Sequence, residues 1–240
     1  MKIAVLTWWP YPQLGGVTTH IELLVQSLQA LGHHVEIIGG EPYPPAASFH
    51  DAQALLARQM TQKVLQRASG VDVVLAEDAL SAVAVRDVLH WTDVPLVLTV
   101  HGYLAYEEAA AGFCAKGDAV YTYLMAAEHK AYRAADAIIC VDERIAQYVG
   151  QIRPGQVAII ENAVDDHLLQ PATPEEKWQA RRRFGFSDRP VLVCARRLTA
   201  KNGVRYAIEA LSLLPESQRP DLVVAGDGED RGRMESLAAG

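Results

Sequence analysis

Short apolar runs alternate with longer amphipathic stretches along the first part of the chain. The runs are 3–6, 35–38, 71–75, 96–100, 137–141 and 157–160. Such runs predict strands buried on both faces, as in a parallel sheet with helical crossovers. Between the first two, apolar residues recur at helical spacing (Val17, Ile21, Leu24, Leu28 and Leu31), and Gly32 follows as a helix stop. We therefore expect a doubly wound α/β domain over residues 1–164.

The pattern changes between residues 165 and 189. This stretch contains Pro171, Pro174, the charged run 175–177 and three arginines at 181–183, which predicts a linker with a short helix. The alternation then restarts, with strands at 191–194 and 222–225, a helix over about 202–214 and another from near residue 230. Two strands and two helices cannot bury both faces of a parallel sheet. We expect residues 190–240 to be the incomplete start of a second Rossmann-like domain, and the chain to be a fragment.

Composition excludes several classes of protein. Half of the residues are apolar and 21% are charged, as in ordinary globular domains. The net charge of −7 argues against a general attraction to nucleic acid, which needs a basic face. Cys114, Cys140 and Cys194 show no C-x-x-C spacing, so neither a disulfide framework nor a zinc site is indicated. The run 3–6 is too short for a signal sequence or a spanning helix, and we expect a cytoplasmic protein.

The loop after the first run ends in a pair of glycines. Residues 8–16 read Trp-Trp-Pro-Tyr-Pro-Gln-Leu-Gly-Gly and lead into the first predicted helix. Ligands of open parallel sheets bind outside the carboxyl ends of the strands, and a helix start presents backbone N–H groups to an anion. Gly15 and Gly16 are therefore candidate diphosphate contacts, with a plain tight turn as the alternative. The loop matches neither the dinucleotide-binding nor the P-loop pattern, which disfavours an oxidoreductase or a P-loop NTPase.

Two polar residues follow later strands. His101 comes directly after the run 96–100 and before Gly102, where its imidazole would project into the site crevice and hydrogen-bond a sugar hydroxyl or an acceptor. Asn162 follows the last run, in the stretch Glu-Asn-Ala-Val-Asp at which the first domain ends. A structural histidine and an Asx turn or helix cap are the respective alternatives.

The second domain contributes a basic loop and a glycine turn. Arg196, Arg197 and Lys201 follow its first strand, where cations suit a leaving diphosphate whose charge grows as a bond to it breaks. A solvated basic loop is the alternative. The second strand ends in the turn 226–228, which reads Gly-Asp-Gly and would either shape a nucleobase pocket or only punctuate the chain.

Taken in this order, the five motifs resemble those of glycosyltransferase family 4, whose members have the GT-B architecture of two facing Rossmann-like domains. The resemblance runs from Lys2 to the end of the chain. The matching positions are Gly15 and Gly16, His101, Asn162 to Asp165, Arg197 to Gly203, and Gly226, Asp227 and Gly228. It implies that residues 1–164 form an acceptor-side domain, 165–189 a linker, and 190–240 the start of a nucleotide-sugar-binding domain.

The resemblance also implies an activity. A member of this family moves a sugar from a nucleoside diphosphate sugar to a glycan, lipid-linked or small-molecule acceptor, retains the anomeric configuration, and needs no metal or other cofactor. The chain contains no D-x-D, the usual metal and diphosphate clamp of the other major glycosyltransferase fold. By resemblance, His101, Arg197 and Lys201 are catalytic. The diphosphate site is Gly15, Gly16, Arg196, Arg197 and Lys201, and the donor pocket is Asn162, Asn202, Gly203, Gly226, Asp227 and Gly228.

Three departures from the family pattern qualify these assignments. Ala163 stands where the family usually has glycine, which is tolerable unless the backbone there needs a positive φ. Asn202 precedes Gly203 where the family has lysine, so that Lys201 lies one place early. The family's Glu-x7-Glu element, which contacts the donor sugar, would lie beyond residue 240. We therefore expect the 240-residue piece alone to be inactive.

Other functions and partners stay open. A catalytically silent GT-B-like subunit and a nucleotide-sugar epimerase are the two alternative classes. Acceptor contacts would come from the loop 102–118, with candidates Tyr103, Tyr106, Glu107 and Glu108. Peripheral contact with the inner membrane face is a further hypothesis, based on Lys63 and Arg67 one helical turn apart and on Trp178 before the arginines at 181–183. A solvated helix face is its alternative.

Overall fold

The computed structural model describes residues 1–13, 15–67, 69–90 and 92–239. Leu14, which belongs to the predicted glycine loop, lies outside the described residues. The chain separates into two compact units, which are described one at a time below. The first unit comprises Met1–Ala109 and Cys114–Asp165, and the second comprises Ala110–Phe113 and Asp166–Gly240.

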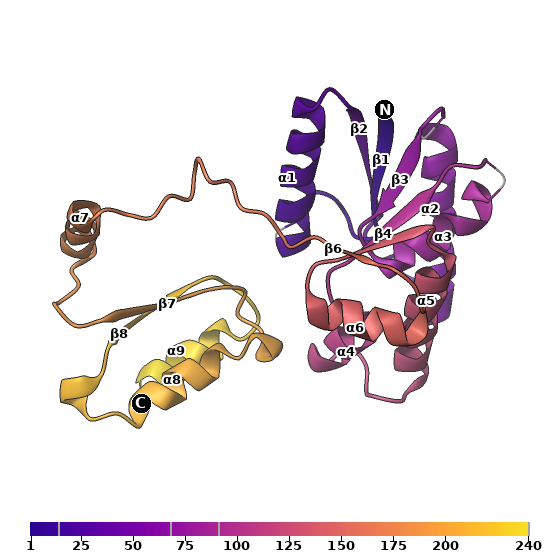
Figure 1. The fold of residues 1–240 in the computed structure, drawn as a ribbon. Helices are drawn as coiled ribbons and strands as arrows, with labels where there is room; N and C mark the ends of the chain where they lie inside the picture. The colour runs from indigo at the N-terminus through magenta and orange to yellow at the C-terminus, as the bar shows by residue number, and fades with distance from the viewer. Residues whose placement is uncertain (14, 68, 91, 240) are drawn as a thin grey trace. The chain divides into compact units, whose positions relative to one another are not determined.

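A six-stranded parallel sheet forms the centre of the first unit (Figure 1). Its strands are β1 (Lys2–Thr7), β2 (His34–Gly39), β3 (Val73–Ala76), β4 (Leu96–Val100), β5 (Ala137–Cys140) and β6 (Ala158–Ile159), in the order β2-β1-β3-β4-β5-β6. Strand β1 pairs with β2 on one side and with β3 on the other, so the winding direction of the chain reverses there. The predicted α/β class is confirmed, and the reversal at β1 marks the ligand-binding edge of such sheets.

Helices cover both faces of this sheet. They are α1 (Gly16–Ala30), α2 (Phe49–Arg67), α3 (Ala79–Leu89), α4 (Leu104–Ala110), α5 (Ala119–Ala134) and α6 (Glu143–Ile152). Alternate residues of a strand point to opposite faces. Ile3 packs on one face with Ile21 of α1, whereas Leu6 belongs to the core that includes Met60 of α2 and Val85 of α3. Burial on both faces explains why the strands read as continuous apolar runs.

Three helices of the first unit begin with an aspartate cap, whereas α1 begins without a side-chain cap. Asp78, Asp118 and Asp142 cap α3, α5 and α6, each side chain accepting a backbone N–H bond of 2.7 to 2.8 Å. Such caps satisfy donors that the helix itself leaves unpaired. Helix α1 instead begins at Gly16 with Gly15 before it, and no side chain caps it. The start of α1 therefore keeps backbone N–H groups without a side-chain partner.

The second unit is a smaller α/β element. It contains α7 (Pro174–Phe184), β7 (Val191–Ala195), the 3-10 helix η1 (Ala200–Asn202), α8 (Val204–Ser212), η2 (Glu216–Gln218), β8 (Asp221–Ala225) and α9 (Arg231–Ala239). The two strands pair in parallel, and Leu198, Val204 and Met234 form a small core. In β7, Leu192 and Val193 are 46% and 63% exposed, so this strand lacks the two-sided cover of β1.

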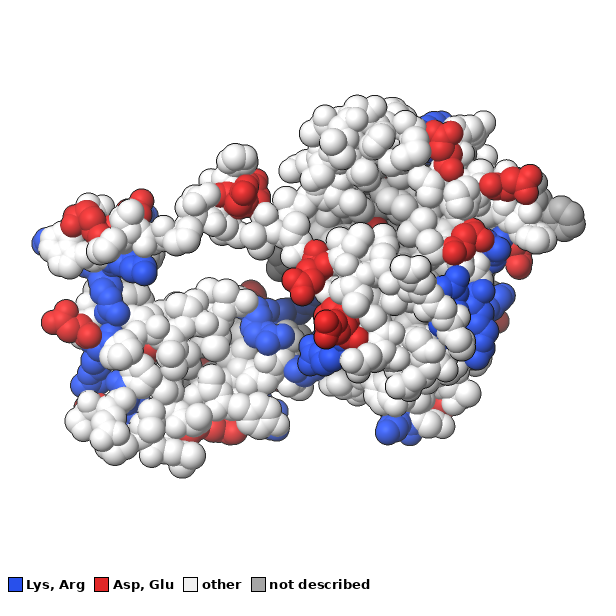
Figure 2. Space-filling view, viewed as in Figure 1, with Lys and Arg blue, Asp and Glu red and all other residues white. Residues whose placement is uncertain are grey.

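No helix within the described ranges combines the length and the apolar character that crossing a bilayer requires. On the viewed surface, Lys and Arg side chains and Asp and Glu side chains form small separate patches on a mostly uncharged surface (Figure 2).

Candidate functional site

Three polar side chains of the first unit meet at the carboxyl edge of the sheet. Glu77 directly follows β3, His101 directly follows β4, and His20 lies in the second turn of α1. Both imidazoles approach the same atom, Glu77 Oε2, with Nε2 of His101 at 2.9 Å and Nε2 of His20 at 3.3 Å. The two rings pack edge to face, with centroids 4.7 Å apart and an interplanar angle of 73°. We name His20, Glu77 and His101 the imidazole cluster.

The three side chains of the imidazole cluster differ in their exposure to solvent. The Glu77 side chain is fully buried, whereas those of His20 and His101 are 18% and 14% exposed. Burial by itself would raise the pKa of Glu77, but hydrogen bonds from the two imidazoles hold that pKa below its usual range. The hydrogen bond to Glu77 raises the pKa of His20 against the opposing effect of burial. The carboxylate is thus ionised, and it favours a charged His20.

Asp78, the residue next to Glu77, has a separate task. Its carboxylate accepts the backbone N–H of Trp8 at 2.6 Å and that of Ser81 at 2.7 Å. It therefore ties the loop after β1 to the start of α3. Burial raises the pKa of Asp78, and these two backbone hydrogen bonds oppose that rise. Asp78 therefore holds backbone N–H groups in place, whereas Glu77 accepts hydrogen bonds from the two imidazoles.

Asn162 and Gly102 lie at the border of the imidazole cluster. A side-chain hydrogen bond joins Asn162, just after β6, to His20 and contributes to the raised pKa of that histidine. At Gly102, a Cβ would come within 1.8 Å of Glu107 Oε1. The glycine after His101 therefore makes room for an acidic side chain of α4. Among the described residues Asp93 is the one non-glycine residue with positive φ, so Ala163 needs no glycine-like backbone.

Gly15 and Gly16 occupy the start of the helix that carries His20. A Cβ at Gly16 would meet no atom within 4 Å, so the space beside the start of α1 is open. The structure therefore brings together four positions that the sequence singled out separately: the two glycines, His101 and Asn162. The combination of an open, uncapped helix start and neutral or cationic imidazoles suits an anionic, hydroxylated ligand.

The basic loop of the second unit is organised by Asn202. Its side-chain oxygen accepts a bond of 2.8 Å from the Arg196 guanidinium, and its amide donates to the Arg197 carbonyl at 2.7 Å. Gly203 follows with φ +69°, a left-handed conformation that favours glycine. Asn202 therefore has a local structural use where family members have lysine. It closes the loop that carries Arg197 and Lys201.

The glycine turn after β8 lies against this loop. A Cβ at Gly226 would be 2.0 Å from the Arg196 carbonyl oxygen, and one at Gly228 would be 2.3 Å from that of Leu198. Between them, the backbone carbonyl of Asp227 accepts a hydrogen bond of 2.9 Å from the backbone N–H of Leu198. Close backbone approach thus explains both glycines. The turn and the basic loop are parts of one local structure within the second unit.

Two members of the imidazole cluster, Glu77 and His20, were not predicted from the sequence. The signal for Glu77 was present, because Glu77 and Asp78 come one residue after the third apolar run, close to the kind of position that singled out His101 after the next run. His20 stands four residues after Gly16, one helical turn into α1. His20, Glu77 and His101 also offer ligand atoms that all lie within 4.8 Å of one another, so these three residues could hold a metal ion.

Comparisons with known proteins identify the family. The family model for Glycosyltransferase Family 4 matches residues 14–168. An uncharacterized glycosyltransferase of Methanocaldococcus jannaschii is 24% identical over 99% of this chain, which spans 66% of that protein's length. Alpha-D-kanosaminyltransferase of Streptomyces kanamyceticus is 29% identical over 60% of this chain and 38% of its own length.

Solved structures share the fold. Sucrose-phosphate synthase from Thermosynechococcus elongatus superposes with a TM-score of 0.78 at 16% identity, covering 99% of this chain and 67% of that chain. Anabaena HepE in complex with UDP-glucose superposes with a TM-score of 0.68 at 19% identity, covering 100% and 65%. Since the family model covers more than half of its residues, this chain belongs to glycosyltransferase family 4 and has the α/β architecture of the GT-B fold.

Proposed function

We propose that the protein transfers a sugar from a nucleoside diphosphate sugar to an acceptor hydroxyl with retention of anomeric configuration. The observation that carries this proposal is the convergence of two imidazoles on buried Glu77 beside the open start of α1. An imidazole can hydrogen-bond sugar hydroxyls, and an uncapped helix start favours phosphate oxygens. The relatives point the same way, since HepE was solved with UDP-glucose and the kanosaminyltransferase is named for sugar transfer.

In this proposal Arg197 and Lys201 stabilise the leaving diphosphate. Guanidinium and ammonium groups are the usual protein partners of phosphate oxygens, and their attraction grows as negative charge develops. Arg196 would join them in binding the diphosphate, and it also donates a hydrogen bond to Asn202 that helps to shape the loop. The turn 226–228 would border the nucleotide, because it packs directly on that loop.

A transfer assay on the full-length protein tests the proposal against its alternatives. UDP-glucose and GDP-mannose would be offered with glycan, lipid-linked and small-molecule acceptors, and products followed by proton NMR. The transferase predicts release of the nucleoside diphosphate and a glycoside with the anomeric configuration of the donor. A silent subunit would bind nucleotide without release, and an epimerase would isomerise the nucleotide sugar. Either of these outcomes, or an inverted product, would refute the proposed reaction.

We further propose that transfer needs no metal. The fixed cations of Arg197 and Lys201 would replace the divalent ion that a D-x-D clamp holds in other glycosyltransferases. Excess EDTA should therefore leave the transfer rate unchanged. A rate that falls with EDTA and returns with Zn²⁺ or Mn²⁺ would contradict this, and would point to the imidazole cluster as the metal site.

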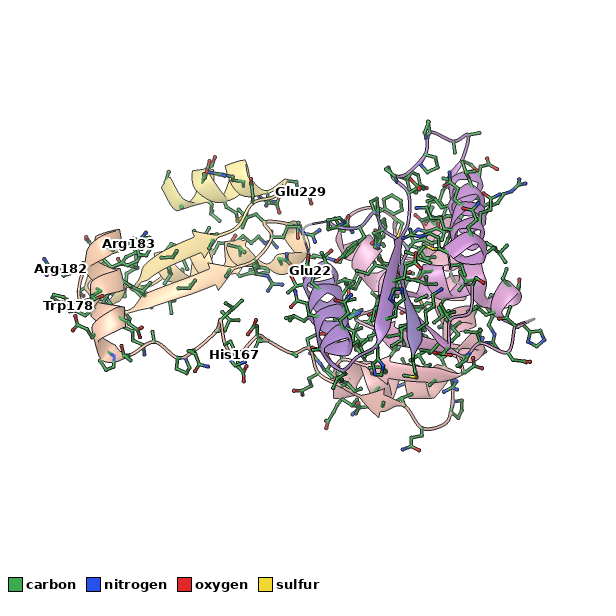
Figure 3. The ribbon with its side chains drawn as sticks, turned by 90° about the horizontal axis from the view of Figure 1, so that it is seen from above. Glu22, His167, Trp178, Arg182, Arg183 and Glu229 are labelled. Carbon is green, nitrogen blue, oxygen red and sulfur yellow. The ribbon has the colours of Figure 1, made fainter. Side chains whose placement is uncertain are left out.

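We also propose that α7 makes peripheral contact with anionic lipid. Trp178 and Phe184 of α7 are 52% and 66% exposed, and the Arg182 guanidinium lies over the Trp178 ring. Figure 3 shows Trp178, Arg182 and Arg183 projecting from this helix. Exposed aromatic and basic residues together are typical of helices that lie on membrane surfaces. The candidates Lys63 and Arg67 on α2 are less suited, because Lys63 pairs with Glu41 and Arg67 with Glu36.

Vesicle co-sedimentation tests the role of α7. The full-length protein should bind vesicles containing phosphatidylglycerol more than pure phosphatidylcholine vesicles, and Trp178→Ser should weaken the binding. Lys63→Ser on α2 is the matched control and should have little effect. Equal sedimentation with both kinds of vesicle would refute the proposed contact of α7 with anionic lipid.

A further inference from the structure

The geometry of the imidazole cluster fixes the proton positions on its rings. An ionised carboxylate accepts hydrogen bonds and cannot donate them. Both Nε2 atoms lie within hydrogen-bonding distance of Glu77 Oε2, at 2.9 Å for His101 and 3.3 Å for His20. Each Nε2 therefore carries a hydrogen. In a neutral imidazole the other nitrogen, Nδ1, is then an acceptor.

Glu77 is itself held in place by the fold. Its backbone N–H donates to the Leu6 carbonyl at 2.9 Å, and its second carboxylate oxygen accepts from the Thr99 hydroxyl at 3.4 Å. The next residue, Asp78, caps α3, which limits backbone movement on that side. The carboxylate is therefore a rigid reference point between β3 and β4, while the rings that it holds reach toward the surface.

We propose that Glu77 is a positioning residue that holds His101 as the Nε2–H tautomer and so leaves Nδ1 as the acceptor for a hydroxyl of the reacting sugar. The proposal rests on the proposed transferase function. His20 is a second positioning residue, because its ring packs edge to face on that of His101 and bonds to the same oxygen. With both ring nitrogens of His101 assigned, the imidazole has one orientation in which it serves substrate and carboxylate together.

Nitrogen-15 NMR of the histidine rings in the full-length protein tests the tautomer directly. Under conditions in which the ring chemical shifts show a neutral imidazole, His101 should carry its hydrogen on Nε2. A His101 ring with its hydrogen on Nδ1 would overturn the proposal. This measurement needs no substitution, so it decides the matter even where a variant fails to fold.

The variant Glu77→Gln then tests the function of the carboxylate. An amide can donate as well as accept, so the His101 ring should populate both tautomers. With UDP-glucose as donor, kcat should fall about 10- to 100-fold, by analogy with the carboxylates that orient metal-bound histidines, while KM changes little. A purely structural role would alter stability without altering the tautomer or the ratio of kcat to KM effects.

Glu128→Gln is the matched control. Glu128 is equally buried, at 1% exposure, but its carboxylate accepts from the Tyr132 hydroxyl at 2.6 Å and from the backbone of Leu104 at 3.2 Å. It should change the free energy of unfolding and leave the His101 tautomer and kcat unaltered. A folded Glu77→Gln protein with wild-type tautomer and kcat would refute the positioning role. A tautomer change in a protein that transfers no sugar would refute the transferase function and leave the positioning role standing.

Discussion

The two units place polar groups at the carboxyl ends of parallel strands in opposite ways. In the first unit, Glu77 is fully buried and holds two partly exposed imidazoles. In the second unit, Arg196 and Arg197 follow a strand whose own apolar residues are largely exposed, and the side-chain amide of Asn202 helps to organise the loop. Burial makes the first arrangement rigid, because an unpaired charge in the interior is costly. The second arrangement keeps its cations accessible to water and to a charged ligand.

The largest expected effect concerns the exposed loop. Replacing Arg197 by Ala should lower kcat/KM for transfer about 10³-fold, equivalent to about 4 kcal/mol, because a charge partner of the transition state is lost. Thermal unfolding should change little. Arg205→Ala on α8 is the control, since that guanidinium bonds to the Tyr206 hydroxyl instead. Unchanged turnover in Arg197→Ala would remove this residue from the diphosphate site.

Two leucines test the difference in burial. Leu6 of β1 is fully buried, whereas Leu192 of β7 is 46% exposed. Leu6→Ala should cost about 3 kcal/mol of unfolding free energy, and Leu192→Ala clearly less, since a half-exposed side chain leaves a smaller cavity. Denaturant unfolding would measure both unfolding free energies, and hydrogen exchange would measure amide protection strand by strand. We also expect strong amide protection in β1 to β6 and weak protection in β7 and β8. Equal costs would mean that the second unit is packed as firmly as the first.

Removing the His101 ring of the imidazole cluster should have a smaller effect on catalysis. His101→Ala should lower kcat on the order of 10²-fold while the protein still folds, because the ring is partly exposed and Glu77 keeps His20 as a partner. His129→Ala, another half-buried histidine on α5, should retain activity. A His101→Ala protein that unfolds, or that keeps full activity, would favour a structural histidine.

The smallest expected effect is a pH dependence of stability. Because the pKa of Glu77 is lowered, its stabilising contribution is present above the ordinary value of 4.5 and is lost as pH falls through the folded pKa. Because the pKa of His20 is raised, its contribution is present below 6.5 and is lost as pH rises through the folded pKa. Both stabilising contributions, that of Glu77 and that of His20, are present between pH 4.5 and 6.5. The difference in unfolding free energy between wild type and Glu77→Gln should peak in that window, and a flat difference across the range would contradict the assignment.

Much of the fold could be read from the sequence, because buried parallel strands need apolar side chains on both faces. The run 3–6 became β1 (Lys2–Thr7) and the run 96–100 became β4 (Leu96–Val100). The run 71–75 was placed slightly early, since β3 spans Val73–Ala76, and 157–160 shortened to β6 (Ala158–Ile159). Strand ends depend on which neighbours pair, and that information is not local.

The sequence by itself determined the strands, the loops at their carboxyl ends and the family to which they belong. It marked His101 and the glycine pair because a strand end or a helix start is a local feature. Only the tertiary structure decided that Glu77 is the carboxylate shared by His101 and His20. The reason is the strand order: β3 lies between β1 and β4, so the residue after β3 meets one ring from the helix after β1 and another from the end of β4.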